Sequence, residues 1–295
     1  MTFLLRLALL LPILFSIFLI GCAGNKSSTS SNGEFTSWGA VSPNVTTHFS
    51  SGNSTAISSG GTVSQTSSNV NANILYDSGG NISAVTLNQT PLNFVSYSVS
   101  AGDSILNDAS GANTIFTSKN QTTIGILANP IPYGFQYQTY GAWGAFGNAG
   151  SAGYAVSIGS LSPVGGIPSV GNAVFNGGAN GYLIDGSKYS YVINALMTAN
   201  VDFSARQITF STTQTSIVGK SGGITSSLPG LNLSGNMSYS SGSNRITGTV
   251  SSASGMSGNI IANFYGPSAN EIGGTFGLTQ PTSGNSLVGG FGGKR

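Results

Sequence analysis

The segment Asn263-Phe264-Tyr265-Gly266-Pro267-Ser268-Ala269-Asn270-Glu271-Ile272-Gly273-Gly274-Thr275-Phe276 places a turn between two runs of alternating apolar side chains. Gly266 and Pro267 mark the turn, because proline presets φ and glycine tolerates a positive φ. The alternation on either side is typical of strands with one buried face. The sequence therefore predicts a β-hairpin with strands at 259–265 and 271–279.

Glu271 stands directly after this turn and is one of seven acidic residues in the chain. Carboxylates beside turns usually accept hydrogen bonds from nearby backbone amides. We therefore expect a structural role for Glu271, with turn amides, Arg206 or Arg245 as the donors, rather than a contact with a ligand.

Six further strands flank the hairpin in the carboxy-terminal half, separated by turns rich in glycine and serine. They are expected at 173–175, 189–203, 207–217, 231–239, 245–250 and 287–291. Eight strands at hairpin spacing predict an up-and-down antiparallel barrel, whose interior is just wide enough to be filled by side chains. The glycines are expected where strands bend at barrel corners. The residues expected to fill the interior are Phe203, Ile208, Phe210, Leu233, Ile246, Phe264, Ile272, Phe276 and Phe291.

The amino-terminal half is also β-rich but less regular. Residues 37–69 are weakly patterned, whereas Val70, Ala72, Ile74 and Tyr76 alternate on one face of a strand. A turn at 77–80 leads into a returning strand at 82–87, which predicts a second hairpin. The chain is therefore expected to be all-β, with an amino-terminal domain before the barrel.

The hairpin segment 263–276 resembles the penultimate hairpin of the transferrin-binding protein B-like surface lipoprotein family. The ending Phe291-Gly292-Gly293-Lys294-Arg295 is similar to the terminal strand of that family. Weaker similarities lie at 137–143, 167–173 and 201–203. The resemblance implies one β-rich handle domain at 37–166 and one eight-stranded barrel at 167–295. It also implies a surface protein that binds a host protein or captures haem. Transferrin binding itself is not carried over, because relatives that bind it have two such lobes.

The amino terminus predicts a lipid anchor. Arg6 precedes an apolar run that ends in Leu19-Ile20-Gly21-Cys22, which resembles the bacterial lipobox. We expect residues 1–21 to be a cleaved signal peptide, Cys22 to be lipidated and residues 22–36 to be a flexible tether. Ala23 after the cysteine favours the outer membrane and display at the cell surface. The alternative is an uncleaved membrane helix at the amino terminus.

The composition excludes some partners and activities. Charged residues make up 5% of the chain, with nine basic and seven acidic residues, so no basic stripe predicts binding to nucleic acid. The pattern Gly219-Lys220-Ser221-Gly222-Gly223 lacks the strand–turn–helix context of a nucleophile elbow, and the single His48 precedes the serine. No close acidic cluster predicts a metal site. We therefore expect a monomer that is not an enzyme.

Candidate ligand contacts lie in an aromatic stretch before the barrel. Tyr133, Tyr137, Tyr140 and Trp143 could contact a macromolecule, since tyrosine and tryptophan provide rigid contact area. With His48 they could instead hold haem, while their alternative role is to pack the handle onto the barrel. Three functions stay open: a binding lipoprotein for a host or environmental ligand, a haem or iron carrier, and a structural envelope lipoprotein. No other cofactor is expected.

Overall fold

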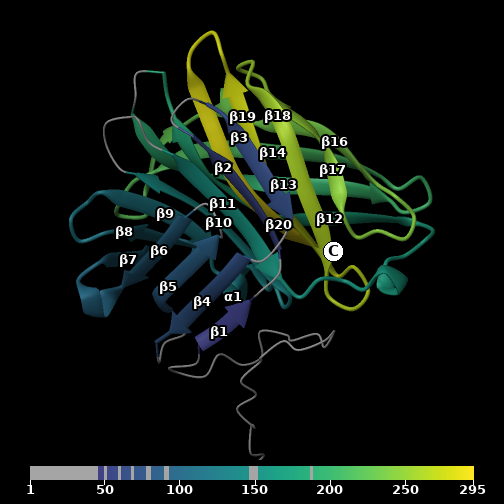
Figure 1. The fold of residues 1–295 in the computed structure, drawn as a ribbon, viewed down its shortest axis with the longest axis horizontal. Coiled ribbons are helices and arrows are strands. Elements are labelled where there is room, and N and C mark those ends of the chain that lie inside the picture. The colour runs from purple at the N-terminus through teal and green to yellow at the C-terminus, as the bar shows by residue number, and fades with distance from the viewer. Residues whose placement is uncertain are drawn as a thin grey trace, which may run out of the picture.

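The computed structural model describes residues 46–49, 52–58, 61–67, 70–77, 81–89, 93–145, 152–186 and 189–295 (Figure 1). The proposed signal peptide, Cys22 and the tether at 22–36 lie outside the described residues. The regular structure is almost entirely antiparallel β-sheet, which confirms the predicted all-β class.

The carboxy-terminal part is a closed barrel of eight antiparallel strands. In sequence order they are β12 (Asn172–Ile184), β13 (Ser190–Asp202), β14 (Gln207–Val218), β16 (Leu233–Tyr239), β17 (Ile246–Ser252), β18 (Ser257–Tyr265), β19 (Glu271–Gln280) and β20 (Asn285–Lys294). The sheet runs β13-β12-β20-β19-β18-β17-β16-β14, and pairing of β13 with β14 closes it. Tyr265 pairs with Glu271 across the predicted turn, so the β18–β19 hairpin is confirmed.

The barrel interior is filled with side chains. All nine residues predicted to fill it belong to one buried apolar cluster. Phe210 and Phe291 meet across the interior with their ring centroids 4.8 Å apart. The cavity recorded there has a volume of about 10 Å³, which is at the lower limit for one water molecule. A ligand therefore has no room inside this barrel.

The handle consists of two antiparallel sheets, which we call the outer and the inner sheet. The outer sheet has the order β1 (Thr46–Phe49), β4 (Val70–Tyr76), β5 (Ile82–Gln89), β6 (Asn93–Ser98). The inner sheet has the order β3 (Val63–Ser67), β2 (Gly52–Ile57), β11 (Gly153–Gly159), β10 (Gln138–Ala145), β9 (Thr123–Ala128), β8 (Asn113–Thr117), β7 (Ser104–Asn107). The short helices are η1 (Val99–Ala101), α1 (Pro130–Tyr133), η2 (Val164–Gly166) and η3 (Pro229–Leu231).

The inner sheet lies between the outer sheet and the barrel wall, so both of its faces are buried (Figure 1). On one face, Trp143 and Val156 pack with Ile74 and Tyr76 of the outer sheet. On the other face, apolar side chains of the inner sheet pack against Tyr182 and Val288 of the barrel. The predicted hairpin of β4 and β5 is confirmed, and its apolar face covers the inner sheet.

Glycine residues line the barrel wall where the inner sheet packs against it. A Cβ atom at Gly290 of β20 would lie 2.6 Å from the carbonyl oxygen of Val156, and one at Gly292 would lie 2.7 Å from the Tyr140 ring. Gly273 of β19 lies under the side chain of Gln138 in the same way. These glycines therefore allow two sheets to approach closely, which differs from the corner role that the sequence predicted.

Two barrel strands are longer than predicted. The sequence predicted a strand at 173–175, but β12 continues to Ile184 through a glycine-rich stretch. In the same way, β20 extends from Asn285 to Lys294. Glycine is unfavourable in strands by itself, and the two predicted strands ended before the pairs Gly177-Gly178 and Gly292-Gly293. The structure also adds β15 (Ile224–Ser227), a short strand outside the closed ring that pairs with β14.

Candidate ligand-binding site

The aromatic stretch before the barrel begins at α1 and continues along β10. Asn129 caps α1, since its Oδ1 accepts a hydrogen bond from the backbone amide of Ile131 at 3.3 Å. The ring of Phe135 then stacks on Tyr133 at 5.1 Å between centroids and meets Tyr140 edge-on at 6.1 Å. The segment thus folds back on itself as a small aromatic cluster.

Tyr140 is fully buried between this cluster and the barrel. Its hydroxyl lies beside that of Tyr133 over the backbone of Gly178 in β12. Burial raises the pKa of the Tyr140 hydroxyl well above its ordinary value, so the hydroxyl stays protonated. These two tyrosines, which the sequence proposed as ligand contacts, therefore come together at the handle–barrel junction.

The other proposed contacts lie apart from this pair. Trp143 stacks on Tyr154 at 5.7 Å between centroids and is 2% exposed, within the core that joins the two handle sheets. Tyr137 is partly buried beside Gly266. His48 lies on β1 opposite Asn73. Tyr140 and Trp143 are both buried. The burial of Tyr140 at the junction supports its role in packing the handle onto the barrel, whereas Trp143 packs between the two handle sheets rather than onto the barrel.

Glu271 joins the handle to the barrel. Its Oε1 accepts a hydrogen bond from the backbone amide of Gln136 at 2.6 Å, and its Oε2 accepts one from Tyr137 at 3.2 Å. The predicted structural role is therefore supported, but the predicted donors are wrong: these amides belong to the handle rather than to the adjacent turn or to an arginine. Burial raises the pKa of Glu271 to about 7, although the amide bonds and Lys294 act in the opposite direction.

Gln138 makes the same kind of junction contact from β10. Its Nε2 donates to the carbonyl of Ile272 at 2.7 Å and to that of Gly293 at 3.3 Å. Further pairs cross the interface, including Asn53 with Asn263 at 2.7 Å. Buried polar groups that find partners on the other unit fix the relative position of the two units. The junction is therefore a specific interface rather than a hinge.

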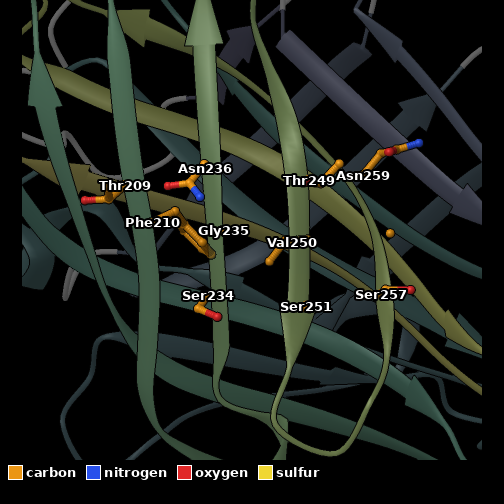
Figure 2. Close-up of a pocket in the computed structure, with 11 residues that line it drawn as sticks. Thr209, Phe210, Ser234, Gly235, Asn236, Thr249, Val250, Ser251, Ser257 and Asn259 are labelled. Carbon is orange, nitrogen blue, oxygen red and sulfur yellow. The ribbon is translucent and has the colours of Figure 1, made fainter.

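The outer barrel wall carries a shallow polar groove of about 670 Å³ on the strands that the inner sheet leaves uncovered (Figure 2). Thr209, Asn236, Thr249 and Asn259 form one row across β14, β16, β17 and β18, because each is the register partner of the next. Figure 2 shows their side chains side by side on neighbouring strands. The residues that line this groove are uncharged, as expected for the solvated face of the barrel.

A second groove, of about 450 Å³, lies on the handle between the two sheets. We call it the handle groove; it is lined by Asp77, Asn81, Ile82, Ser83, Val99, Ile105, Leu106 and Asn107. Val99 is 56% exposed and Leu106 is 44% exposed, whereas Ile105 packs partly into the core. Asn107 donates to Asn81 at 3.0 Å and holds the two walls together. Sequence reasoning missed this site, because its apolar residues come from separate loops and strands.

The Gly-x-Ser-x-Gly pattern of the sequence lies in a turn of the barrel. The Gly219–Gly223 pattern forms the turn between β14 and β15, in which the Gly219 amide donates to the Gly223 carbonyl at 2.8 Å. This is a strand–turn–strand and not the context of a nucleophile elbow. Across the described ranges, no group of three or more His, Cys, Asp or Glu residues could hold a metal ion. None of the described helices is long and apolar enough to cross a membrane.

Comparison with known proteins identifies the barrel. Residues 167–295 match the family model described as the C-lobe and N-lobe beta barrels of Tf-binding protein B. The chain carries a β-barrel of the transferrin-binding protein B type. The resemblance predicted from the hairpin and the terminal strand is therefore confirmed for this part of the chain. A comparison of the whole sequence with curated proteins finds no match.

Solved structures of transferrin-binding protein B are also similar. A mutant of the Haemophilus parasuis protein is 14% identical, with a TM-score of 0.47, and the match covers 82% of this chain and 44% of that one. The Neisseria meningitidis serogroup B protein is 15% identical, with a TM-score of 0.47 and coverage of 82% and 43%. A mutant of the Actinobacillus pleuropneumoniae protein is 14% identical, with a TM-score of 0.42, and the match covers 82% of this chain and 98% of that one. This chain thus spans less than half the length of the first two structures.

Proposed function

We propose that this protein is a non-enzymatic binding protein, held at the outer membrane by a lipid on Cys22, that recognises its ligand through the handle groove. The filled barrel is the observation that carries the proposal. A cavity of about 10 Å³ cannot hold a ligand, so recognition falls on the outer surface and its loops.

The handle groove suits this role better than the polar wall of the barrel. It combines two exposed apolar side chains, Val99 and Leu106, with the amides of Asn81 and Asn107. Apolar contact area surrounded by polar groups is the usual composition of a recognition site. The polar wall in Figure 2 offers hydroxyl and amide groups, but the side chains on its outer face include no large apolar anchor.

The family match supports the proposal from another direction. The matched model describes barrels of a transferrin-binding protein, and the solved relatives carry that name. Binding of a macromolecule at the cell surface is therefore the expected function class. The identity of the ligand is a separate matter, since fold does not determine it.

The test compares capture of serum proteins by the mature chain and by two variants. Val99→Ser combined with Leu106→Ser removes the exposed apolar side chains of the handle groove, and Ile224→Ser changes an even more exposed apolar residue on β15 of the barrel. We expect the groove variant to lose a captured partner that the control variant retains. Equal capture by all three proteins would contradict the assignment to the handle.

A second readout separates the alternatives. Haem is added to the same proteins and the absorbance spectrum is recorded. A new haem band that disappears in His48→Ala would favour the carrier function over macromolecular binding. Mass spectrometry of the mature amino terminus tests the anchor independently of any ligand.

A further inference from the structure

We propose that one end of the barrel docks on an anionic lipid surface, so that the handle groove faces away from the membrane. We call this region the arginine end. It comprises the β13–β14, β16–β17 and β18–β19 turns, the segment 160–171 and the carboxy terminus. The inference deepens the proposed function, because it gives the orientation in which an anchored protein would present its groove.

The arginine end holds every arginine of the chain after residue 22. Arg206 lies in the β13–β14 turn, Arg245 follows the β16–β17 turn and Arg295 ends the chain, and all three are exposed. The turns are in contact: the Tyr239 amide donates to the carbonyl of Arg206 at 3.3 Å. Arg295 lies 6.0 Å from the ring centroid of Phe203, which stands in the same turn as Arg206.

The acidic groups at this end are Asp202, Glu271 and the α-carboxylate of Arg295, against the three arginines and Lys294. Asp202 lies at the same end, where its Oδ1 accepts a hydrogen bond from the Ala205 amide at 2.9 Å and so caps the β13–β14 turn. Glu271 is 2% exposed and faces the handle amides, with Lys294 beside it. Of the described charged residues, only Asp185 and Lys220 lie in turns at the opposite end of the barrel. The positive charge is therefore concentrated at one end.

Apolar side chains project beside the arginines. Val170 is 73% exposed and Val164 is 47% exposed, both on the segment that enters the barrel. The Phe203 amide donates to the carbonyl of Gly171 at 3.0 Å, which holds Val170 next to the β13–β14 turn. Exposed apolar residues among basic ones are typical of surfaces that insert shallowly into a charged lipid interface.

The opposite part of the molecule has the opposite charge. Asp77, Asp103 and Asp108 lie on the handle, against one described basic residue, Lys119. Figure 1 shows β7 and β8, next to Asp103 and Asp108, on the side away from the carboxy terminus. An anionic membrane would attract the arginine end and repel the handle acids, so the charge distribution selects one orientation.

A second copy of the chain is a weaker candidate than a membrane as the partner of the arginine end, although the acidic handle of that copy could face it. Asp103 already accepts hydrogen bonds from the amides of Ser98 and Lys119, each at 2.9 Å. Asp108 accepts from the Ser110 amide at 3.1 Å and from Asn113 at 2.7 Å. These carboxylates are engaged in their own turns, so they are poorly placed to pair with the arginines of a second copy.

The experiment measures partition of the chain from residue 22 onward, with Cys22→Ser to exclude the lipid, onto vesicles. One set contains phosphatidylcholine alone and the other also contains phosphatidylglycerol. Two double variants are compared. One combines Arg206→Gln and Arg245→Gln; the other combines Lys119→Gln and Lys220→Gln and removes the same charge from other parts of the molecule. Each basic residue near an anionic surface contributes about fivefold in partition, which corresponds to about 1 kcal/mol.

We expect binding to the anionic vesicles only, weakened about 25-fold by the arginine pair and much less by the lysine pair. Equal losses for the two pairs, or no binding to anionic vesicles, would overturn the proposal. Concentration-dependent dimers that the arginine pair abolishes, without vesicle binding, would assign the surface to a second copy instead. Because the lipid is absent, none of these results depends on whether Cys22 is acylated.

A second measurement does not depend on removing charge. Val170→Cys in the Cys22→Ser background provides a single thiol for an environment-sensitive fluorophore, and Ile224→Cys, on the far end of the barrel, is the control. We expect anionic vesicles to shift the emission of the label at position 170 to the blue and to leave that at position 224 unchanged. A shift at neither position, or at both, would contradict docking through the arginine end.

Discussion

Gly290→Ala tests how closely the handle is seated on the barrel. The new Cβ would lie 2.6 Å from the carbonyl oxygen of Val156 and 3.1 Å and 3.2 Å from the carbonyl oxygen and amide nitrogen of Gly141. All three atoms are backbone atoms of the inner sheet, so no side-chain rotation can relieve the contact. The sheet itself has to move away from the barrel by a large part of an ångström.

The expected magnitude follows from this geometry. Overpacking a well-packed core by one methyl group costs about 1–3 kcal/mol. For a chain of this size, each kcal/mol lowers the melting temperature by about 2–4 °C, so we expect a loss of about 2–12 °C. The handle and the barrel should still unfold together, because polar pairs such as Glu271 with Gln136 link them.

Thermal and urea unfolding of Gly290→Ala and of Gly223→Ala provide the measurement. A Cβ at Gly223 meets no atom within 4 Å, so that control should be neutral or more stable by about 0.4–1 kcal/mol through the unfolded state. If the two variants have the same free energy of unfolding, the inner sheet does not approach the barrel wall as closely as the structure places it.

Three further predictions concern the core, the junction and the anchor. Phe276→Ala should lower the free energy of unfolding by about 3–5 kcal/mol, because Phe276 is 2% exposed inside the barrel; a change near zero in urea unfolding would mean that the ring faces solvent. Burial raises the pKa of Glu271 from 4.5 to about 7, so its proton is bound more tightly in the folded state. The free energy of unfolding should therefore fall by about 3 kcal/mol as the pH rises from about 4.5 to about 7, and Glu271→Gln should remove this dependence; an unchanged pH profile in the variant would exclude Glu271 as the cause. Cys22→Ala should release the protein from membranes without changing its melting temperature, as membrane fractionation and calorimetry can check, and continued membrane association would argue against the lipid anchor.

The barrel could be predicted from the sequence because its strands obey a local rule. Alternation at Leu233–Tyr239 and Ile246–Ser252 places every second side chain inside, and that period alone identifies the residues of the interior. Phe264 and Phe276 were predicted in the same way and are buried. The rule fails for Asn172–Ile184, where glycines interrupt the alternation although the strand continues.

The handle groove could not be predicted, because its parts are far apart in the sequence. Asn81 and Asn107 meet only when the outer sheet folds over the edge of the inner one. Val99 lies between two serines and Leu106 belongs to the short apolar pair Ile105-Leu106, and neither pattern by itself indicates a core or a site. The same holds for the arginine end, whose three guanidinium groups come from two turns and the carboxy terminus, which only barrel closure brings together.

What the sequence by itself determined is the approximate position of the eight barrel strands and the residues that fill the barrel interior, since alternation depends on neighbours two residues apart. What only the tertiary structure decided is which surface remains exposed. Tyr140 and Trp143 look like binding residues in the sequence, yet both are buried, Tyr140 against the barrel and Trp143 against the outer sheet. Burial depends on contacts between distant segments, such as Tyr140 with Gly178, and no local pattern encodes such contacts.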